Sequence, residues 1–388
     1  MIVRKVIINN LKDALELVKK TGSSDVVHKY LAQKGTSFSV IIEQIDNRAA
    51  NILKQEAISV NADVSVNENI SRFKKGFSDL ILFANFAQIL KLISKLKLQP
   101  FGLKEVSCNL ERLINNKKIF RYKGKSLDLS NPVVMGIINM DPDSFSGDGL
   151  TCPDKAQIQA LEFQRAGAGI IDIGAESTRP GAKLIDARTE IKRLLPALKK
   201  IRKKVKIPIS VDTYKYETAK AALNEGADII NDIFALRVGK EKLARLIVDT
   251  KAGLILMHMK GVPKNMQKLP FYKNCTAEVF KFLLDRKNYA LSFGVKEEYI
   301  CVDPGPGFGK SVEHNLELIK NISTFSSLGA VVGAVSRKRF VRVLAGEDKT
   351  SFVAANFLCA FCGADILRVH DVKETVNVLK IIQAFRGI

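Results

Sequence analysis

The side chains in this sequence with the clearest chemical potential are polar residues that directly follow short apolar runs. The plainest case is Gly169–Glu176, an apolar run that ends abruptly and is followed by the polar stretch Ser177–Gly181. An apolar run of this length without alternation fits a strand that is buried on both faces. The polar tail then fits a loop at the carboxyl end of that strand. Carboxylates placed there can accept parallel hydrogen bonds, and an arginine offers a planar fork to phosphate oxygens.

Seven further segments share this pattern, and helical stretches separate most of them. The eight candidate strands are Val133–Asn139, Gly169–Glu176, Ile207–Asp212, Asp228–Asp232, Gly253–His258, Tyr299–Asp303, Ala330–Ser336 and Ile366–His370. The intervening helices include Lys155–Ala166, Glu190–Lys200, Glu217–Glu225, Glu241–Asp249 and Thr276–Phe293. This alternation of eight strands with helices predicts an α/β fold, a (β/α)8 TIM barrel. The alternative, a doubly wound open sheet, would need a Gly-rich turn after its first strand, and Asn139–Ser144 is not one.

A barrel of this kind carries its active site at the carboxyl ends of the strands. The polar residues at those ends are Asn139, Glu176, Asp212, Asn231, Asp232, His258, Asp303, Ser336, Arg368 and His370. Any one of them could equally cap a turn or a helix. Chance would not place the whole set at the same end of the strands, so the set predicts one shared site.

Composition places the chain among soluble globular proteins. It has 388 residues, 46% of them hydrophobic and 26% charged, and no apolar run approaches the length needed to span a bilayer. The first residues, Met1–Val6, lack the long apolar core of a signal peptide. Six cysteines in a chain of this size do not make a disulfide framework. We therefore expect a cytoplasmic enzyme without a membrane segment.

The formal net charge of +21 has two interpretations. It could attract an anionic ligand, nucleic acid or an acidic membrane surface. It could also reflect lysines scattered over the surface, which is the simpler interpretation because the lysines are spread along the chain. No zinc-finger, RNP or helix-turn-helix signature accompanies them, and tryptophan is absent. We expect no nucleic-acid partner.

Residues 1–130 differ from the rest and predict a small α+β domain, with a boundary at Asn131-Pro132 before a catalytic domain of residues 131–388. The expected helices are Leu11–Lys19, Ile52–Gln55 and Phe83–Leu96. The possible strands are Ser37–Ile42 and Ile58–Val66. The region shows no Gly-rich phosphate loop and no Cys/His cluster, so its role stays open.

From Val133 onward the sequence resembles the dihydropteroate synthase family. The resemblance is carried, in the family's order, by Gly136–Ser146, Ile170–Gly181, Ser210–Thr213, Ile229–Ile233, Met257–Gly261, Asp303–Lys310, Ser336–Lys338 and Arg368–Val372. The first domain is similar to the N-terminal extension of the family's long bacterial form, through Ala49–Glu56 and Gln99–Glu105.

The resemblance implies a transferase of folate biosynthesis and a sulfonamide target. Such an enzyme condenses 6-hydroxymethyl-7,8-dihydropterin diphosphate with 4-aminobenzoate, giving 7,8-dihydropteroate and diphosphate. It also implies a homodimer. Two alternatives stay open: a pterin-dependent methyltransferase barrel, and a binding protein without catalytic activity. The motifs Ser336–Lys338 and Arg368–His370 argue against the methyltransferase, because a methyl carrier has no diphosphate to bind.

The resemblance also assigns roles to individual residues. Asp303 should read the pterin, with Asp212 and Asn231 at the remaining ring nitrogens and Lys338 at the carbonyl and ring edge. Asn139, Arg368 and His370 should hold the diphosphate, with Asn139 as the ligand of a Mg2+ ion. Thr178, Arg179, Pro180 and Ser336, with Phe145 and Phe308 as walls, should form the aminobenzoate site. The expected catalytic set is Asp212, Asp303, Lys338 and Arg368.

Two further residues and one motif have more than one interpretation. Asp141 stands where the family usually has threonine, so it could be a second Mg2+ ligand or could repel diphosphate. His258 is expected to be a buried structural histidine rather than a catalyst. Cys359 and Cys362 form a Cys-x-x-Cys motif without a second pair, and we interpret them as core residues rather than a metal or redox site.

Overall fold

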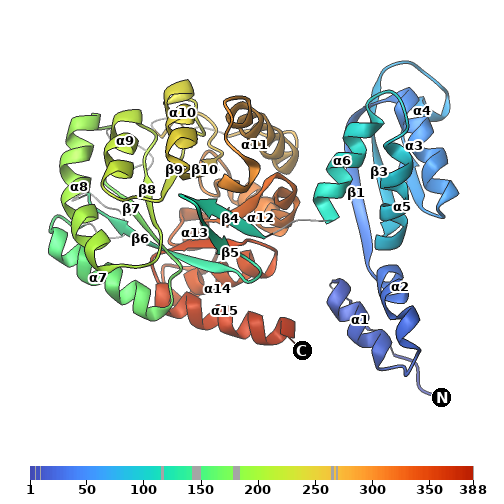
Figure 1. The fold of residues 1–388 in the computed structure, drawn as a ribbon, viewed down its shortest axis with the longest axis horizontal. Helices are drawn as coiled ribbons and strands as arrows, with labels where there is room; N and C mark the ends of the chain where they lie inside the picture. Colours follow the sequence, from blue (N-terminus) through green and yellow to red (C-terminus); the bar gives the residue numbers. More distant parts are fainter. Residues whose placement is uncertain are drawn as a thin grey trace. The chain divides into compact units, whose positions relative to one another are not determined.

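The computed structural model describes residues 1–4, 6–8, 10–114, 118–141, 150–177, 184–263, 266–267 and 270–387. The chain divides into two compact units, Met1–Asn116 and Lys117–Ile388 (Figure 1). Each unit has a hydrophobic core of its own. Within the described ranges, no helix is both long and apolar enough to cross a bilayer.

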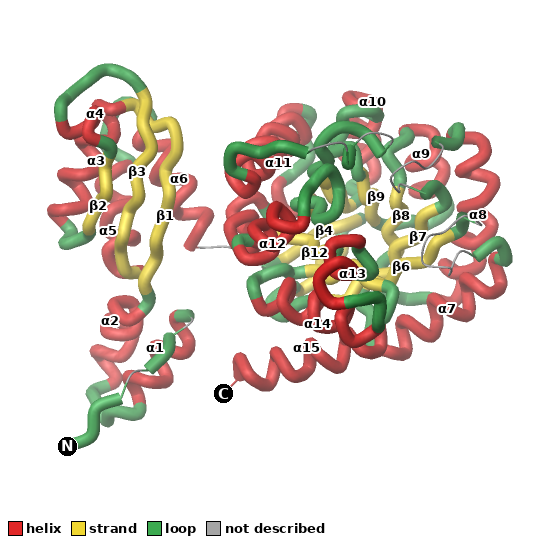
Figure 2. The backbone as a smooth tube through the Cα atoms, turned by 180° about the vertical axis from the view of Figure 1, so that it is seen from behind, coloured by secondary structure: helices red, strands yellow, loops and turns green. Residues whose placement is uncertain are grey.

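The second unit is a closed barrel of eight strands in which every neighbouring pair is parallel. Figure 2 shows the strands in yellow inside a ring of helices. The strands are β6 (Val133–Asn139), β7 (Ile170–Gly174), β8 (Ile209–Asp212), β9 (Ile229–Asp232), β10 (Gly253–Met257), β11 (Ile300–Asp303), β12 (Ala330–Gly333) and β13 (Ile366–Val369). Each lies inside the segment predicted for it, so the predicted TIM barrel is confirmed.

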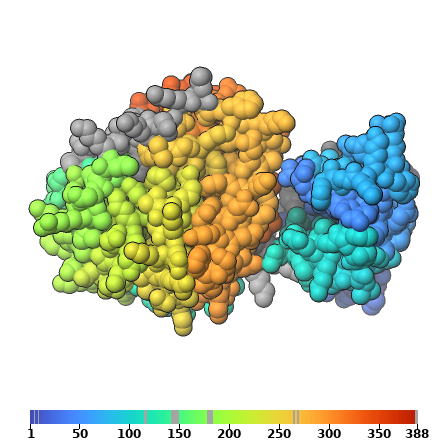
Figure 3. Space-filling view, turned by 90° about the horizontal axis from the view of Figure 1, so that it is seen from above, coloured from blue at the N-terminus to red at the C-terminus, as the bar shows by residue number. Residues whose placement is uncertain are grey.

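Helices follow the strands and cover the outside of the barrel. They are α7 (Pro153–Ala166), α8 (Ala187–Lys204), α9 (Tyr216–Asn224), α10 (Lys240–Thr250), α11 (Cys275–Ser292), α12 (Val312–Lys320), α13 (Arg339–Ala345), α14 (Lys349–Phe361) and α15 (Val372–Gly387), with short 3-10 turns at Glu297–Tyr299 and Ile322–Leu328. In the space-filling view, successive segments coloured green, yellow and orange lie side by side around the surface (Figure 3).

The barrel interior changes from apolar to polar along the strands. One buried cluster at its amino end joins Met135, Ile170, Ile229, Ile255, Cys301, Val332 and Ile366. Successive side chains of a strand point to opposite faces, so the residue two positions later faces inward again. Those later residues are Ile137, Asp172, Asn231, Met257, Asp303, Ala334 and Arg368. Because all the strands are parallel, their polar inward residues gather at the carboxyl rim.

A β-hairpin closes the opposite end of the barrel. Its strands are β4 (Ile119–Tyr122) and β5 (Lys125–Asp128), and its Phe120 is fully buried in the apolar cluster at the amino end. A Cβ added at Gly253 would lie 2.6 Å from the Phe120 ring, so that position has room only for glycine. The domain boundary predicted at residues 130 and 131 therefore falls too late. The hairpin belongs to the barrel because its apolar side chains fill the barrel floor.

The first unit contains a three-stranded antiparallel sheet in the order β1-β3-β2. Its elements are α1 (Leu11–Lys19), α2 (Asp25–Gly35), β1 (Ser37–Asp46), α3 (Asn47–Ser59), β2 (Asp63–Val66), α4 (Glu68–Ser71), β3 (Phe77–Asn85), α5 (Phe86–Leu96) and α6 (Leu103–Ile114). The core joins alternate residues of β3, such as Leu80 and Leu82, to apolar positions of α3 and α5. This small unit has the predicted α+β composition.

Two sequence predictions in this unit are wrong in part. The predicted helix Phe83–Leu96 begins only at Phe86, because β3 runs to Asn85. The Asn85 side chain accepts a hydrogen bond from Gln88 N at 2.9 Å and the Gln88 side chain bonds back to Asn85 N, so the helix starts there. In the predicted strand Ile58–Val66, the first residues complete α3 and the strand covers Asp63–Val66.

The cysteines behave as packing residues. All six are free, and Cys359 is fully buried. Its Sγ lies 2.4 Å from the position that a Cβ on Gly333 would take, so the thiol fills the gap between α14 and β12. Burial raises the pKa of Cys359, which disfavours the thiolate needed for metal binding or redox chemistry.

The hairpin can be tested through its buried aromatic. We expect Phe120→Ala to lower the free energy of unfolding by about 3 to 5 kcal/mol, because it removes a fully buried ring and leaves a cavity at the barrel floor. Urea unfolding followed by circular dichroism measures the change. Phe271, whose side chain is 75% exposed, supplies the control, and Phe271→Ala should change the free energy by less than about 0.5 kcal/mol. Equal effects of the two substitutions would contradict the assignment.

Candidate active site

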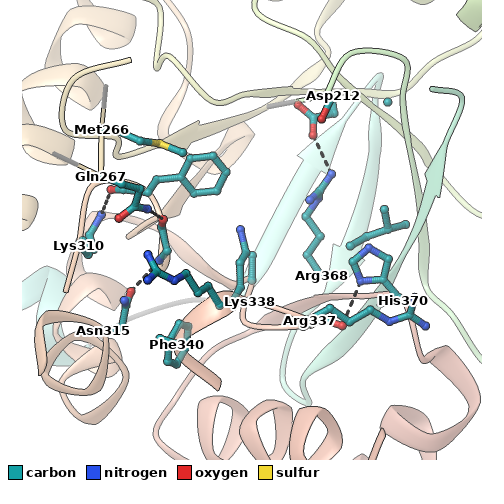
Figure 4. A pocket seen from close by; sticks show the side chains of 18 of the residues that line it. Asp212, Met266, Gln267, Lys310, Asn315, Arg337, Lys338, Phe340, Arg368 and His370 are labelled. Atoms are coloured by element: carbon teal, nitrogen blue, oxygen red, sulfur yellow. Dashed lines mark hydrogen bonds and ion pairs between the residues drawn. The ribbon is translucent and has the colours of Figure 1, made fainter. Parts of the chain in front are cut away.

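A cavity of about 620 Å3 opens at the carboxyl rim of the barrel. Ile137, Asn139, Gly174, Asp212, Ala334 and Arg368 line it from the strands and their ends, and the loops after β10, β11 and β12 supply much of the rest. Figure 4 shows Lys338 between the Asp212–Arg368 pair and Met266 with Gln267. The volume suits a ligand of drug size, and concave sites of this kind hold most small-molecule ligands.

Arg368 connects two aspartates at the centre of the rim. Its Nε donates to Asp172 Oδ2 and its Nη2 donates to Asp212 Oδ2, both at 2.7 Å. Burial by itself would lower the pKa of Arg368, but Asp172 and Asp212 outweigh that effect and raise it. Burial raises the pKa of Asp212, with Arg368 opposing and Asp172 adding to the rise. The predicted residues Asp212 and Arg368 are thus brought together, and their charges partly compensate.

Asp172 was missed by the sequence prediction. It lies in the middle of an apolar run, but its position two residues after inward-facing Ile170 could have marked it as an interior residue. The side chain is fully buried, and its Oδ1 has no hydrogen-bond partner among the described residues. Asn231 Oδ1 and Ser210 Oγ are also buried and have no hydrogen-bond partner among the described residues. Buried polar atoms in this state are candidates for contact with a ligand.

Asp303 ends β11 and is 2% exposed. Its Oδ1 accepts a hydrogen bond from Gly305 N at 2.7 Å. Burial raises the pKa of Asp303, while the Gly305 bond, Lys338 and Arg368 oppose the rise. Gly305 has a φ of 64°, and a Cβ there would lie 2.0 Å from His258 O, so the chain can turn at this point only with glycine.

Lys338 reaches the cavity from the N-cap of α13. Its Nζ lies 4.1 Å from the centroid of the Phe308 ring, a cation–π distance. Burial and the nearby Arg368 lower the pKa of Lys338 to about 8, with Asp303 and Asp212 opposing. The structure therefore places Lys338 and Phe308 in direct contact. This agrees with the prediction that the motifs Asp303–Lys310 and Ser336–Lys338 belong to one site.

Ser336 and His370 join the ends of β12 and β13. Ser336 Oγ lies 3.1 Å from His370 Nδ1 and accepts a hydrogen bond from His370 N at 3.3 Å. Both line the cavity with Asn139. The sequence assigned Ser336 to the aminobenzoate and His370 to the diphosphate, so their contact puts the two proposed subsites side by side.

Asp141 is held by Arg193 from α8, a residue that the sequence analysis did not single out. Arg193 Nη1 donates to Asp141 Oδ1 at 3.1 Å and to Ala175 O at 3.4 Å. Asp141 is 6% exposed and lines the cavity. Its negative charge is therefore compensated by an arginine, which weakens the repulsion it would exert on a diphosphate.

Some polar residues at the strand ends support loops instead of facing the cavity. Asp232 accepts hydrogen bonds from Phe234 N at 2.8 Å and Leu236 N at 2.7 Å. His258 Nδ1 lies 2.9 Å from Lys310 Nζ, and burial lowers the pKa of His258 well below its ordinary value. His258 is thus a buried histidine, as predicted.

Glu176 lines the cavity and also ties two segments together. Its Oε1 accepts from Ile185 N at 2.7 Å, and its Oε2 accepts from Lys215 at 2.9 Å. Thr178, Arg179, Pro180 and Phe145, which the sequence assigned to the aminobenzoate site, lie outside the described residues.

The site residues match the pattern of a known family. The pterin binding enzyme family matches residues 135–370. Dihydropteroate synthase of Haemophilus influenzae is 41% identical over 266 residues, covering 67% of this chain and 96% of that protein. The bifunctional dihydropteroate synthase/dihydropteroate reductase of Helicobacter pylori is 32% identical over 393 residues and covers 99% of both chains.

Solved structures agree with these sequence relatives. The Yersinia pestis dihydropteroate synthase with a sulfonamide drug complex has a TM-score of 0.67 and 36% identity, covering 70% of this chain and 100% of that one. The Xanthomonas albilineans enzyme in complex with 7,8-dihydropteroate has a TM-score of 0.61 and 34% identity, covering 70% and 99%. The shared barrel, the rim residues and the match to most of the chain lead to one conclusion: this chain belongs to the pterin binding enzymes, among the dihydropteroate synthases.

Proposed function

We propose that the chain joins 6-hydroxymethyl-7,8-dihydropterin diphosphate to 4-aminobenzoate with the residues of the barrel rim. The observation that carries this assignment is the set of polar residues at the carboxyl rim. Asp172, Asn231 and Asp303 are buried there, Arg368 bonds to Asp172 and Asp212, and Lys338 lies beside them in the cavity wall. This set combines acceptors for the N–H groups of a flat heterocycle with cations for a carbonyl and a departing anion. A methyl-transferring barrel would need the acceptors but not the anion-binding groups.

The pterin is recognised by hydrogen-bond acceptors that the folded barrel shields from water. The Asp303 carboxylate keeps acceptor capacity beyond its bond to Gly305 and takes the amino and ring N–H groups. The buried Asn231 Oδ1 and the Asp212 carboxylate contact the remaining ring nitrogens, and the buried Asp172 Oδ1 offers a further acceptor. Lys338 donates to the carbonyl and ring edge. Because the barrel fold already holds these groups in place, little free energy is spent on rearranging them when the ring binds.

The diphosphate is held by Asn139, Arg368 and His370. Arg368 uses Nε and Nη2 for the two aspartates, which fixes the guanidinium plane. A Mg2+ ion fits this donor set, because magnesium is usually bound by few protein oxygens together with substrate phosphates. Asn139 would hold it, and the ion would neutralise charge on the leaving group. The described residues contain no cluster of three or more His, Cys, Asp or Glu side chains suited to a metal.

The reaction is a substitution at the methylene carbon. The carbon–oxygen bond to diphosphate breaks, and its electron pair leaves with the diphosphate. The lone pair of the aryl amine then forms the new carbon–nitrogen bond, and the amine loses a proton to water. Asp212 stabilises the positive charge that develops on the dihydropterin. An aryl amine is a neutral nucleophile at pH 7, so the step needs no general base.

The aminobenzoate site combines Phe308 and Ser336 with Thr178 and Arg179. Phe308 packs against a buried cluster that includes Met257, Met259 and Met266, and it supplies an aromatic wall. Two solved relatives, from Xanthomonas albilineans and Thermus thermophilus, are described with 4-aminobenzoate. Incubation of the chain with both substrates and Mg2+ should release diphosphate and form 7,8-dihydropteroate. A folded preparation that forms neither product would overturn the proposal.

We also propose a homodimer in the cytoplasm. Exposed apolar side chains on α14 and α15, namely Leu358, Phe361, Ile381 and Phe385, support a contact between copies. Six free cysteines support a reducing compartment. Light scattering should give twice the chain mass of 42.9 kDa. A mass of one chain at micromolar concentration would contradict the dimer.

A second activity is favoured by the match over the whole chain. The Helicobacter pylori relative covers 99% of this chain, including the first unit, and its name adds dihydropteroate reductase. We propose that this chain also reduces 7,8-dihydropteroate to the tetrahydro form, with the Met1–Asn116 unit required. The reduction adds a hydride and a proton across the remaining C=N bond of the dihydropterin ring. The electrons must come from an external hydride donor, such as a reduced nicotinamide or flavin.

The pH dependence of the synthase should follow Lys338. Its lowered pKa of about 8 means that it is an ammonium below pH 8 and becomes neutral above it. We therefore expect kcat/KM for the pterin diphosphate, measured at saturating 4-aminobenzoate, to fall as the pH rises through 8. Lys338→Arg should move the fall to higher pH because a guanidinium stays charged. Lys338→Met should lower kcat/KM by at least about tenfold and remove the fall. An unaltered profile in Lys338→Met would contradict the assignment.

Removal of the first unit should separate the two activities. The Haemophilus influenzae relative aligns with 67% of this chain over 96% of its own length, so it has little room for a further domain, and residues 117–388 should fold alone. We expect the shortened chain to keep synthase activity and to lose reduction of 7,8-dihydropteroate. The assay supplies the product with NADPH, with and without added flavin, and follows tetrahydropteroate. Reduction at the full rate by the barrel alone would remove the first unit from this activity.

A further inference from the structure

The turn after β11 is unusual in how its carbonyl groups are satisfied. In Gly305–Gly309, four carbonyls accept hydrogen bonds from side chains instead of from a helix or sheet. Gly307 O accepts from Gln267 Nε2 at 2.6 Å, and Gly309 O accepts from Tyr272 Oη at 2.9 Å. The other two carbonyls bond to one residue, Lys310. Side chains from the loop after β10 therefore fix a turn that faces the cavity.

Lys310 is the centre of this arrangement. Its Nζ donates to Gly305 O at 2.9 Å and to Phe308 O at 3.1 Å, and it lies 2.9 Å from His258 Nδ1. Three acceptors match the three N–H groups of an ammonium. His258 then accepts at Nδ1, so its own proton sits on Nε2 and the ring is neutral, in agreement with its lowered pKa. Lys310 is 4% exposed.

The turn that Lys310 holds sets the position of Phe308. The Phe308 ring lies beneath the Lys338 ammonium at 4.1 Å. A Cβ on Gly307 would lie 3.1 Å from Lys338 Cδ, so the backbone of the turn also packs against that lysine. A shift of the turn would therefore move both the aromatic wall and the lysine that rests on it.

We infer that Lys310 is a positioning residue for the aminobenzoate site: its ammonium fixes the Gly305–Phe308 turn so that the Phe308 ring faces the aromatic acid. The inference rests on the proposed function, which makes Phe308 a wall of that site. In its protonated form Lys310 donates three hydrogen bonds and has no free electron pair, so its role in the turn is not that of a base.

The charges around Lys310 come from several elements. Burial lowers its pKa to about 7, Cys275 and Asp303 oppose that shift, and Lys338 and Lys260 add to it. The three acceptors at 2.9 to 3.1 Å favour the protonated form. Deprotonation would leave two N–H groups for three acceptors, so the turn should loosen as the pH rises through this range.

The test compares Lys310→Met with Lys287→Met. Lys287 is also 4% exposed but lies on α11 and pairs with Glu297, and it does not line the cavity. We expect Lys310→Met to raise KM for 4-aminobenzoate and its Kd in the presence of diphosphate and a pterin by about tenfold. Binding of the pterin diphosphate should change by less than about threefold. Lys287→Met should leave all three constants at wild-type values.

A double-mutant cycle shows whether Lys310 acts through Phe308. Phe308→Ala alone should weaken 4-aminobenzoate binding to a similar degree, and the double variant should bind no more weakly than the weaker single variant. Fully additive losses would overturn the inference. So would equal weakening of pterin and aminobenzoate binding in Lys310→Met.

A milder variant covers the case in which Lys310→Met does not fold. Gln267→Ala removes one bond to the same turn and should raise KM for 4-aminobenzoate about threefold, with kcat changed less. An unchanged KM in Gln267→Ala would count against the turn as a positioning element. Wild-type chain that binds no 4-aminobenzoate would contradict the proposed function itself, which is a different result from either outcome above.

Discussion

The contact between Arg368 and its two aspartates is the interaction on which the site depends. A guanidinium 2.7 Å from both Asp172 and Asp212 allows three charged groups to remain close together at the carboxyl rim of the barrel. Removing one partner from such a group leaves an uncompensated buried charge, which is far costlier than losing an exposed ion pair. The same arrangement fixes the guanidinium plane, so that its remaining face and the carboxylate oxygens are ready for a ligand. Stability and binding therefore come from the same atoms.

The barrel provides stability at one end of its axis and ligand binding at the other. The amino end is filled by apolar residues and closed by Phe120, and it provides burial without any polar requirement. The carboxyl rim can then carry unsatisfied oxygens, such as those of Asp172 and Asn231, because the floor beneath it is well packed. The loops complete the site by side-chain bonds to backbone, as in the turn at Gly305–Gly309. Loops fixed in this way can position a ring as accurately as a strand does.

The division of the chain into two units adds a second level of organisation. The barrel contains the groups needed for synthesis, and relatives that match the barrel alone carry the synthase name. The first unit has its own core and is matched in full by a relative named for two activities. Under the proposed second activity, the product of the barrel would be the substrate of the reduction.

The sequence by itself determined the barrel, its strands and most of the rim, because apolar runs and the helical stretches between them are local properties of the chain. Asp212, Asn231, Asp303 and Lys338 could be named in advance from motifs at the strand ends. Tertiary structure decided which of these side chains meet. The partners Asp172 and Arg193 were not predicted, and the hairpin was assigned to the wrong domain, because each depends on a contact with residues far away in the sequence. The role of Lys310 likewise follows from three acceptors that only folding brings to one nitrogen.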